Sequence, residues 1–156
     1  MKAIHWIIAA LGLAFVLPAP ANAAQTDPEV IIYRFPGVRE TGGAAGTGVA
    51  TVFHCTNFSG VTETLRIVIR GASGALLTNT PIGIVHLETR TISTKPTDLF
   101  SGTSVDPGVV AQGTAAIAAT TTSFICTAMI VDAASFSPNG ISLRGIRFNP
   151  APGSQE

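Results

Sequence analysis

The side chains of this sequence that could carry chemistry are few, and His54 comes first because it directly precedes Cys55. An imidazole that activates a thiol is one of the standard arrangements of nucleophilic catalysis. Adjacent residues of a strand point to opposite faces, so a strand at this place would separate the two side chains. A cysteine in a disulfide is also no nucleophile. The sequence therefore argues against a catalytic pair at this position.

A metal site is the second chemical possibility. His86 and Glu88 are two residues apart, a spacing that places both side chains on one face of a strand. His54, Asp98 and Asp132 could complete such a site. Metal sites normally show more ligands at close spacing, so the alternative is a polar strand end that faces water. A small metal-dependent or hydrolytic enzyme that uses His54 and His86 is thus a hypothesis, but no cofactor is expected.

Other catalytic and binding patterns are missing from the sequence. No Gly-x-Ser-x-Gly elbow occurs, and the Gly-rich residues 42–46 lack the Lys-Ser/Thr that follows a phosphate-binding loop. Trp6 is the single tryptophan and Tyr33 the single tyrosine, so flat platforms for sugar stacking are scarce. Nine basic residues balance nine acidic ones without a run of either sign, which excludes the electrostatic signature of a nucleic-acid-binding protein.

The first 23 residues predict a signal peptide. Lys2 supplies the positive charge, residues 4–17 are mostly apolar, and Ala21-Asn22-Ala23 places cleavage after residue 23. The apolar stretch is shorter than the ~20 residues of a membrane-spanning helix, and no later segment reaches that length, so cleavage is favoured over an uncleaved anchor. We expect a bacterial protein of the periplasm or the extracellular medium, with no membrane span after cleavage.

Cys55 and Cys126 are the only cysteines of the chain. Two cysteines in an oxidising compartment are expected to pair. The alternatives to a disulfide are a metal-binding pair and a reactive free thiol. A metal-binding pair would need further cysteines or histidines close by, and no group of them is near. Both cysteines lie in apolar, β-like runs, so the prediction is one disulfide that joins two strands far apart in the sequence.

Strands, rather than helices, are predicted to position these residues, because Val, Ile, Thr and Gly are frequent and charged residues are rare. The clearest strand is residues 62–70. One face is apolar and the other carries charges, which is typical of a half-buried antiparallel strand. The apolar face contains Leu65, Ile67 and Ile69, and the opposite face contains Thr64, Arg66, Val68 and Arg70.

The remaining elements follow from alternation and turn residues. Further strands are predicted at residues 30–34, 48–57, 81–93, 123–132 and 140–148, the last with a bulge at Gly145. Residues 113–119 fit either a strand or a short helix. Residues 57–61 predict a hairpin turn, and residues 41–48 and 94–108 predict loops.

About seven short strands predict a single antiparallel β-sandwich over residues 24–156, with an ordered core of about 30–149. The placement of Cys55 and Cys126 resembles the immunoglobulin-like fold, in which a disulfide joins an early strand to the penultimate strand across the core. The resemblance implies such a bond between the sheets here. The core tryptophan of that family is missing, and Phe124 stands where a tyrosine is typical, two residues before the second cysteine. His54-Cys55-Thr56-Asn57 and Cys126-Thr127-Ala128 also resemble segments of small exported bacterial proteins that have no assigned activity.

These observations favour a non-enzymatic extracytoplasmic module that binds a partner or contributes to a surface assembly. The partner would be another extracytoplasmic protein or an envelope component, contacted through the loops at residues 41–48 and 94–108. The enzyme that uses His54 and His86 is the second hypothesis. An inhibitor of secreted hydrolases that presents an exposed loop is the third.

Overall fold

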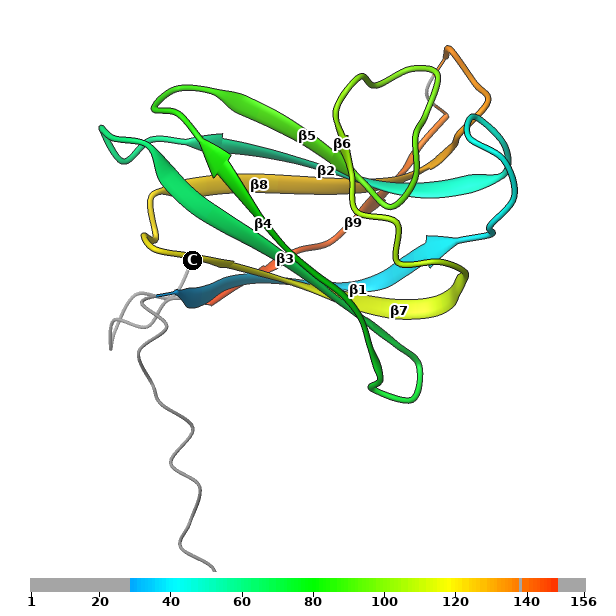
Figure 1. Ribbon diagram of the computed structural model, residues 1–156, viewed down its shortest axis with the longest axis horizontal. Helices are drawn as coiled ribbons and strands as arrows, with labels where there is room; N and C mark the ends of the chain where they lie inside the picture. The colour runs from blue at the N-terminus through cyan, green and yellow to red at the C-terminus, as the bar shows by residue number, and fades with distance from the viewer. Residues whose placement is uncertain (1–28, 138, 149–156) are drawn as a thin grey trace, which may run out of the picture.

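The computed structural model describes residues 29–137 and 139–148. The predicted signal peptide and the polar tail beyond residue 149 lie outside these ranges. The described chain forms ten strands in two sheets (Figure 1) and contains no helix, hence none that could cross a membrane. The prediction of an all-β fold is thereby confirmed.

Each sheet has five strands. Sheet A contains, in spatial order, β10 (Ile146–Arg147), β1 (Val30–Glu40), β7 (Val110–Ala119), β3 (Glu63–Gly71) and β4 (Leu76–Ile84). Sheet B contains β6 (Thr103–Ser104), β5 (Thr89–Ser93), β2 (Val49–Asn57), β8 (Phe124–Asp132) and β9 (Ile141–Leu143). Neighbouring strands are antiparallel except β5 and β6, which are parallel.

The main core lies between the two sheets and draws residues from both. Leu65, Ile67 and Ile69 of β3 are fully buried in it, as their alternation predicts. The ring of Phe35 in sheet A meets the ring of Phe53 in sheet B edge to face, with centroids 5.7 Å apart. Burial of these large side chains, each contributing roughly 1.5–3 kcal/mol, is the main force that holds the two sheets together.

A second, smaller core lies on part of the outer face of sheet B. Its buried members are Ala50, Val52, Val131 and Ala133, and Phe100 from the long loop after β5 packs over them. The loop at residues 94–108 is thus mainly irregular, as predicted, but it also covers part of one face of sheet B.

Strand β1 continues where the sequence predicts an end. The pattern Phe35-Pro36-Gly37 indicated a break after Arg34, yet the strand reaches Glu40. Strand β10 pairs only with Tyr33 and Arg34, so β1 has an open edge beyond them, where the missing N–H of Pro36 interrupts no pairing. Gly37 has a φ of 88° and absorbs a register shift against β7. The prediction of a short first strand was therefore wrong.

The single strand predicted over residues 81–93 is two strands in different sheets. β4 ends at Ile84 in sheet A, and β5 begins at Thr89 in sheet B. The turn between them includes Leu87 with a φ of 62°. The start of β4 was not predicted: after Leu76 and Leu77 it continues with the polar residues Thr78 to Thr80, and Pro81 within the strand suits its place at the edge of sheet A.

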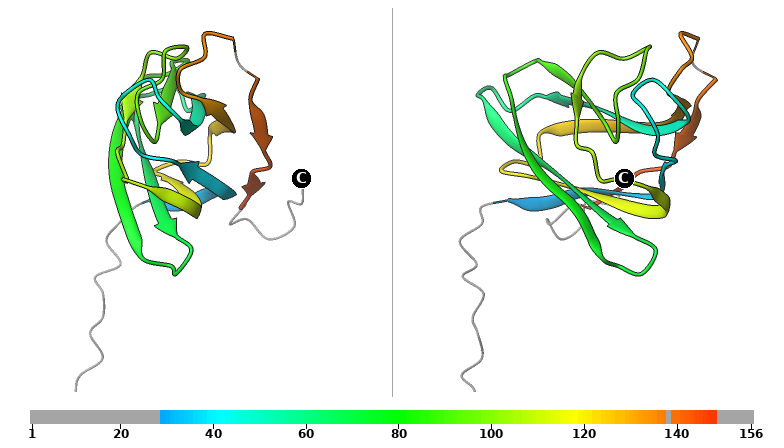
Figure 2. Two further views of the ribbon diagram at one scale, coloured as in Figure 1. Left: turned by 90° about the vertical axis from the view of Figure 1, so that its right-hand side faces the viewer. Right: turned by 45° about the vertical axis from the view of Figure 1, so that its right-hand side comes forward.

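The end of the chain changes sheet instead of bulging. The break falls at Arg144 and Gly145, as the alternation indicates, but β9 pairs with β8 and β10 pairs with β1. Figure 2 shows this segment running between the two sheets. A Cβ atom at Gly145 would collide with the Phe35 ring, so only glycine allows this close passage.

Residues 113–119 and 57–61 also have defined places in the fold. Residues 113–119, for which strand and helix were both open, belong to β7 at the centre of sheet A. Residues 57–61 form a turn, but it leads from sheet B to sheet A and is not a hairpin.

Candidate functional site

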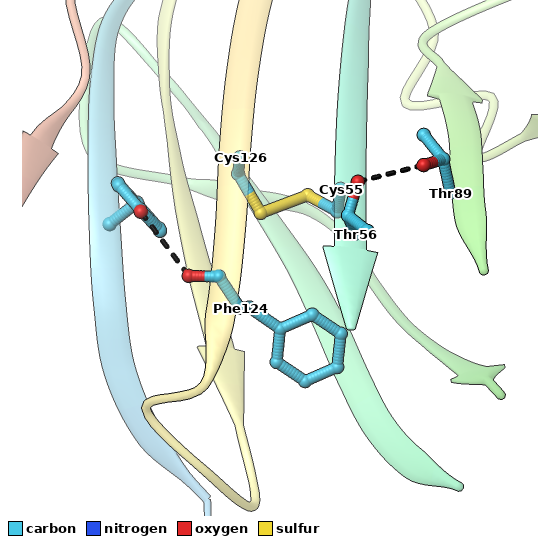
Figure 3. The surroundings of a disulfide bond; sticks show 6 residues. Cys55, Thr56, Thr89, Phe124 and Cys126 are labelled. Carbon is cyan, nitrogen blue, oxygen red and sulfur yellow. Dashed lines mark hydrogen bonds between the residues drawn. A yellow bond between two sulfur atoms is a disulfide. The ribbon is translucent and has the colours of Figure 1, made fainter. Parts of the chain in front are cut away.

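The disulfide forms between Cys55 and Cys126, as predicted. The two residues are direct partners on β2 and β8, which are neighbours in sheet B (Figure 3). Their Cα atoms are 4.2 Å apart, the short spacing of a pair without mutual backbone hydrogen bonds. The bond therefore stays within one sheet, and the connection between sheets that the immunoglobulin-like resemblance implied is wrong. With both sulfur atoms bonded, the chain has no free thiol for catalysis.

His54 lies on the outer face of sheet B, opposite to Cys55. Its Nδ1 is 3.1 Å from the Thr91 hydroxyl, and its ring meets the Phe100 ring with centroids 4.8 Å apart. Burial lowers the pKa of His54 below its usual range, which favours the neutral ring. These contacts describe a side chain that packs a loop onto the sheet.

His86 and Glu88 do not share a strand face, because both lie in the turn between β4 and β5. His86 Nδ1 accepts a hydrogen bond from the Gly60 N–H at 3.0 Å. Glu88 accepts one from the Val85 N–H at 2.9 Å and pairs with Arg90 at 2.9 Å. Each candidate is thus engaged separately.

The proposed additional ligands are not brought to these histidines. Asp98 lies in the loop after β5, where its N–H donates to the Ala133 carbonyl, and the Asp132 carboxylate accepts from the Ala134 N–H at 3.0 Å. Within the described ranges, no three His, Cys, Asp or Glu side chains are grouped as metal ligands would be. The arrangement of these side chains therefore does not support the metal hypothesis.

A buried polar cluster ties the two long loops together. Lys95, only 3% exposed, donates to the carbonyl oxygens of Gly42 at 2.5 Å and Gly43 at 3.4 Å. Glu40 is 5% exposed, and one of its carboxyl oxygens has no hydrogen-bond partner. Burial raises the pKa of Glu40, the positive charge of Lys95 opposes this, and Asp106 adds to it. The loops expected to contact a partner are thus fastened to each other.

Glu40→Gln is expected to raise the free energy of unfolding at pH 7 by about 1 kcal/mol. The folded state binds the Glu40 proton more tightly than the unfolded state, so stability falls as pH rises from 4.5 through the folded-state pKa. Glutamine mimics the protonated form and removes this fall. Urea unfolding at pH 4 and pH 7 measures it, with Glu63→Gln as the control for a less buried carboxylate. A loss of stability at pH 7 would mean that attraction to Lys95 outweighs the cost of burial.

Among the residues that the structure describes, one feature that could hold a ligand is a trough on the outer face of sheet A. It is a depression of about 360 Å³ whose floor includes Ala116 and Ala118 of β7. Arg34 of β1 rises on one side, and Arg66 and Arg70 of β3 rise on the other. In the register, Arg34 and Val68 flank Ala116, so long side chains border short ones. We call this feature the arginine trough.

The trough carries a net positive charge. Its lining includes three arginines and a single acidic residue, Glu29. Arg66 is held by Glu29 through two hydrogen bonds of 2.5 and 3.1 Å and donates a third to Asn79 at 3.2 Å. Arg70 donates to the Gly74 carbonyl at 2.9 Å. Arg34 stacks over the Phe148 ring, with its guanidinium carbon 5.5 Å from the ring centroid. The contacts of Arg34 and of Arg70 each leave guanidinium N–H groups for a ligand.

A second hollow of about 290 Å³ lies further along β7. It is lined by Gln112 and Thr114, with Pro36 of β1 and Gly71 of β3 on its sides. The register places Thr114 between Pro36 and Arg70, so this hollow begins where the arginine trough ends. The two depressions together follow one strand across the sheet.

Sequence reasoning did not identify this site. The alternation of β3 placed Arg66 and Arg70 on its solvent face, but nothing connected them to Arg34 or to the small residues of β7. The signal was an alanine-rich strand, which becomes a trough only when longer residues border it. No protein-family model matches the chain, and no curated protein or solved structure matches it significantly.

Proposed function

We propose that the protein is a non-enzymatic extracytoplasmic module that binds an anionic polymer in the arginine trough. The observation that carries the proposal is the group of three arginines around a floor of alanines on an open sheet face. Guanidinium groups bind carboxylates and phosphates through paired, charge-assisted hydrogen bonds. The predicted signal peptide and the disulfide support the compartment.

The spacing of the arginines favours a polymer over a small anion. Arg66 and Arg70 are four residues apart on β3, which corresponds to roughly 13 Å along a strand. Arg34 lies across β7 from Val68, midway between them. A single carboxylate or phosphate cannot reach all three side chains, whereas an extended chain that follows β7 can. Polygalacturonate and poly-L-glutamate, with regularly repeated carboxylates, are suitable probes.

Arg34→Ala and Arg70→Ala are each expected to weaken the binding of such a polymer about tenfold, the loss of one charged hydrogen-bonding group. Isothermal titration calorimetry with polygalacturonate measures this, and affinity should also fall as salt rises. Arg144→Ala, an exposed arginine outside the trough, is the matched control and should bind as the wild type does. Neutral dextran is the control ligand.

Two outcomes would overturn the proposal. One is the absence of binding to both polyanions at low salt. The other is binding that Arg34→Ala and Arg144→Ala weaken equally, because net charge and not the trough would then be responsible.

A further inference from the structure

Two neighbouring connections at one end of the molecule present large apolar side chains to solvent. The first joins β2 to β3 and carries Phe58 and Val61, which are 48% and 60% exposed. The second joins β4 to β5 and carries Val85 and Leu87, which are 55% and 63% exposed. Figure 1 shows both connections at the same end of the two sheets. We call these four side chains the apolar tip.

The buried Asn57 fastens the two connections to each other. Its backbone N–H donates to the Glu88 carbonyl at 3.1 Å, and its carbonyl accepts from the Leu87 N–H at 2.7 Å. Its side-chain amide donates to the Val61 and Ile84 carbonyls, both at 2.8 Å. The tip is therefore fixed in shape before it meets any partner.

Nearly every backbone donor of the tip is already used within the protein. All five N–H groups of residues 57–61 donate to acceptors of the chain, and so do those of Val85, Leu87 and Glu88. Surface loops normally leave such groups to water. A loop whose N–H donors are satisfied internally loses less free energy when it leaves water, because only its remaining carbonyl acceptors lose their partners.

This property distinguishes a lipid surface from a protein surface. A protein partner can accept hydrogen bonds from a loop, so a loop that binds proteins through its backbone benefits from free donors. The hydrocarbon of a bilayer offers no acceptor, and segments that enter it must satisfy their donors internally. The apolar tip meets that requirement for these eight N–H groups.

The charges at the tip indicate which lipid. Residues 57–62 contain no charged side chain, and the acidic Glu88 of the second connection is neutralised by Arg90 at 2.9 Å. Attraction to anionic lipids needs a cluster of basic residues, and neither connection contains Lys or Arg. We propose that the apolar tip inserts into the interface of a zwitterionic bilayer and so holds the protein on a membrane surface.

The experiment is co-sedimentation of the oxidised protein, as recovered after export, with phosphatidylcholine vesicles. The wild type is expected to bind, and Leu87→Asp and Phe58→Asp are each expected to lower the partition coefficient about tenfold or more. Ile141→Asp and Phe136→Asp introduce the same charge at apolar positions outside the two connections that are at least as exposed, and these variants should bind as the wild type does. Unchanged melting temperatures show that the variants are folded.

Failure of the wild type to bind phosphatidylcholine, including a case in which it binds another protein instead, would overturn the inference. Equal losses in the tip and control variants would overturn it as well. Binding restricted to phosphatidylglycerol vesicles and abolished by Arg34→Ala would assign the contact to the arginine trough and not to the tip. The inference does not depend on the trough, so each can fail alone.

Discussion

Replacing both Cys55 and Cys126 by alanine is expected to lower the free energy of unfolding by about 4 kcal/mol. The disulfide closes a loop over a sequence separation of 71 residues, and a cross-link of that length strongly restricts the unfolded chain. A domain of this size is typically stable by only 5–15 kcal/mol, so the double variant would be close to unfolding at 37 °C. Urea unfolding of the oxidised protein and the variant measures the difference.

The reduced wild-type protein is the control for this prediction. It keeps both sulfur atoms in the main core and loses only the cross-link, so it separates the effect of the bond from that of missing side-chain volume. Reduced protein and double variant should both be destabilised by several kcal/mol. A reduced protein as stable as the oxidised one would show that the pairing of β2 with β8 does not need the bond.

Asn57→Ala is expected to lower the free energy of unfolding by about 3 kcal/mol. Its amide donates to the carbonyls of Val61 and Ile84, and its Oδ1 accepts from the Ser59 N–H at 2.8 Å. Asn57 is fully buried, so alanine leaves the buried Ile84 carbonyl without this donor and the Ser59 N–H without its acceptor, while the Val61 carbonyl keeps the hydrogen bond from the Ser59 hydroxyl. Thermal and urea unfolding measure the loss.

Two further variants sharpen this prediction. Asn57→Asp keeps the shape and the Oδ1 acceptor but has no amide to donate, so it should be at least as destabilising as alanine at neutral pH. Asn79→Ala removes a more exposed asparagine that contacts Arg66, and its effect should stay within about 0.5 kcal/mol. If Asn57→Ala cost no more than Asn79→Ala, the two connections would be held by their backbone hydrogen bonds alone.

The alternation of apolar and polar residues predicted the strands that face the core on one side and solvent on the other. Residues 62–70 correspond to β3 because one face meets the core and the other meets solvent. The pairing of Cys55 with Cys126 was predicted from the expected oxidising compartment and from the presence of only two cysteines, not from geometry. Which strands are neighbours was not predictable in this way, and the bond was consequently placed between sheets when it lies within one.

The errors occurred where the chain passes from one sheet to the other. Residues 81–93 keep an alternating pattern, less clean than that of residues 62–70, through the turn at Leu87, and this pattern does not indicate that Ile84 and Thr89 belong to different sheets. The arginine trough was missed for a related reason. Arg34 and Arg70 are 36 positions apart in the numbering and meet only through the register of β1 and β3 with β7.

The position of the disulfide also determines how the molecule responds to mechanical force. When the chain is pulled from both ends, tension passes from Cys55 directly to Cys126, and the segment between them, which includes β3 to β7, is not stretched. At about 3.4 Å per extended residue, the bond withholds roughly 240 Å of contour length from the pulled chain. Under force, an oxidised molecule would therefore extend only through the portions before Cys55 and after Cys126. Reduction would allow the segment between the two cysteines to extend as well, which makes the chain a longer tether.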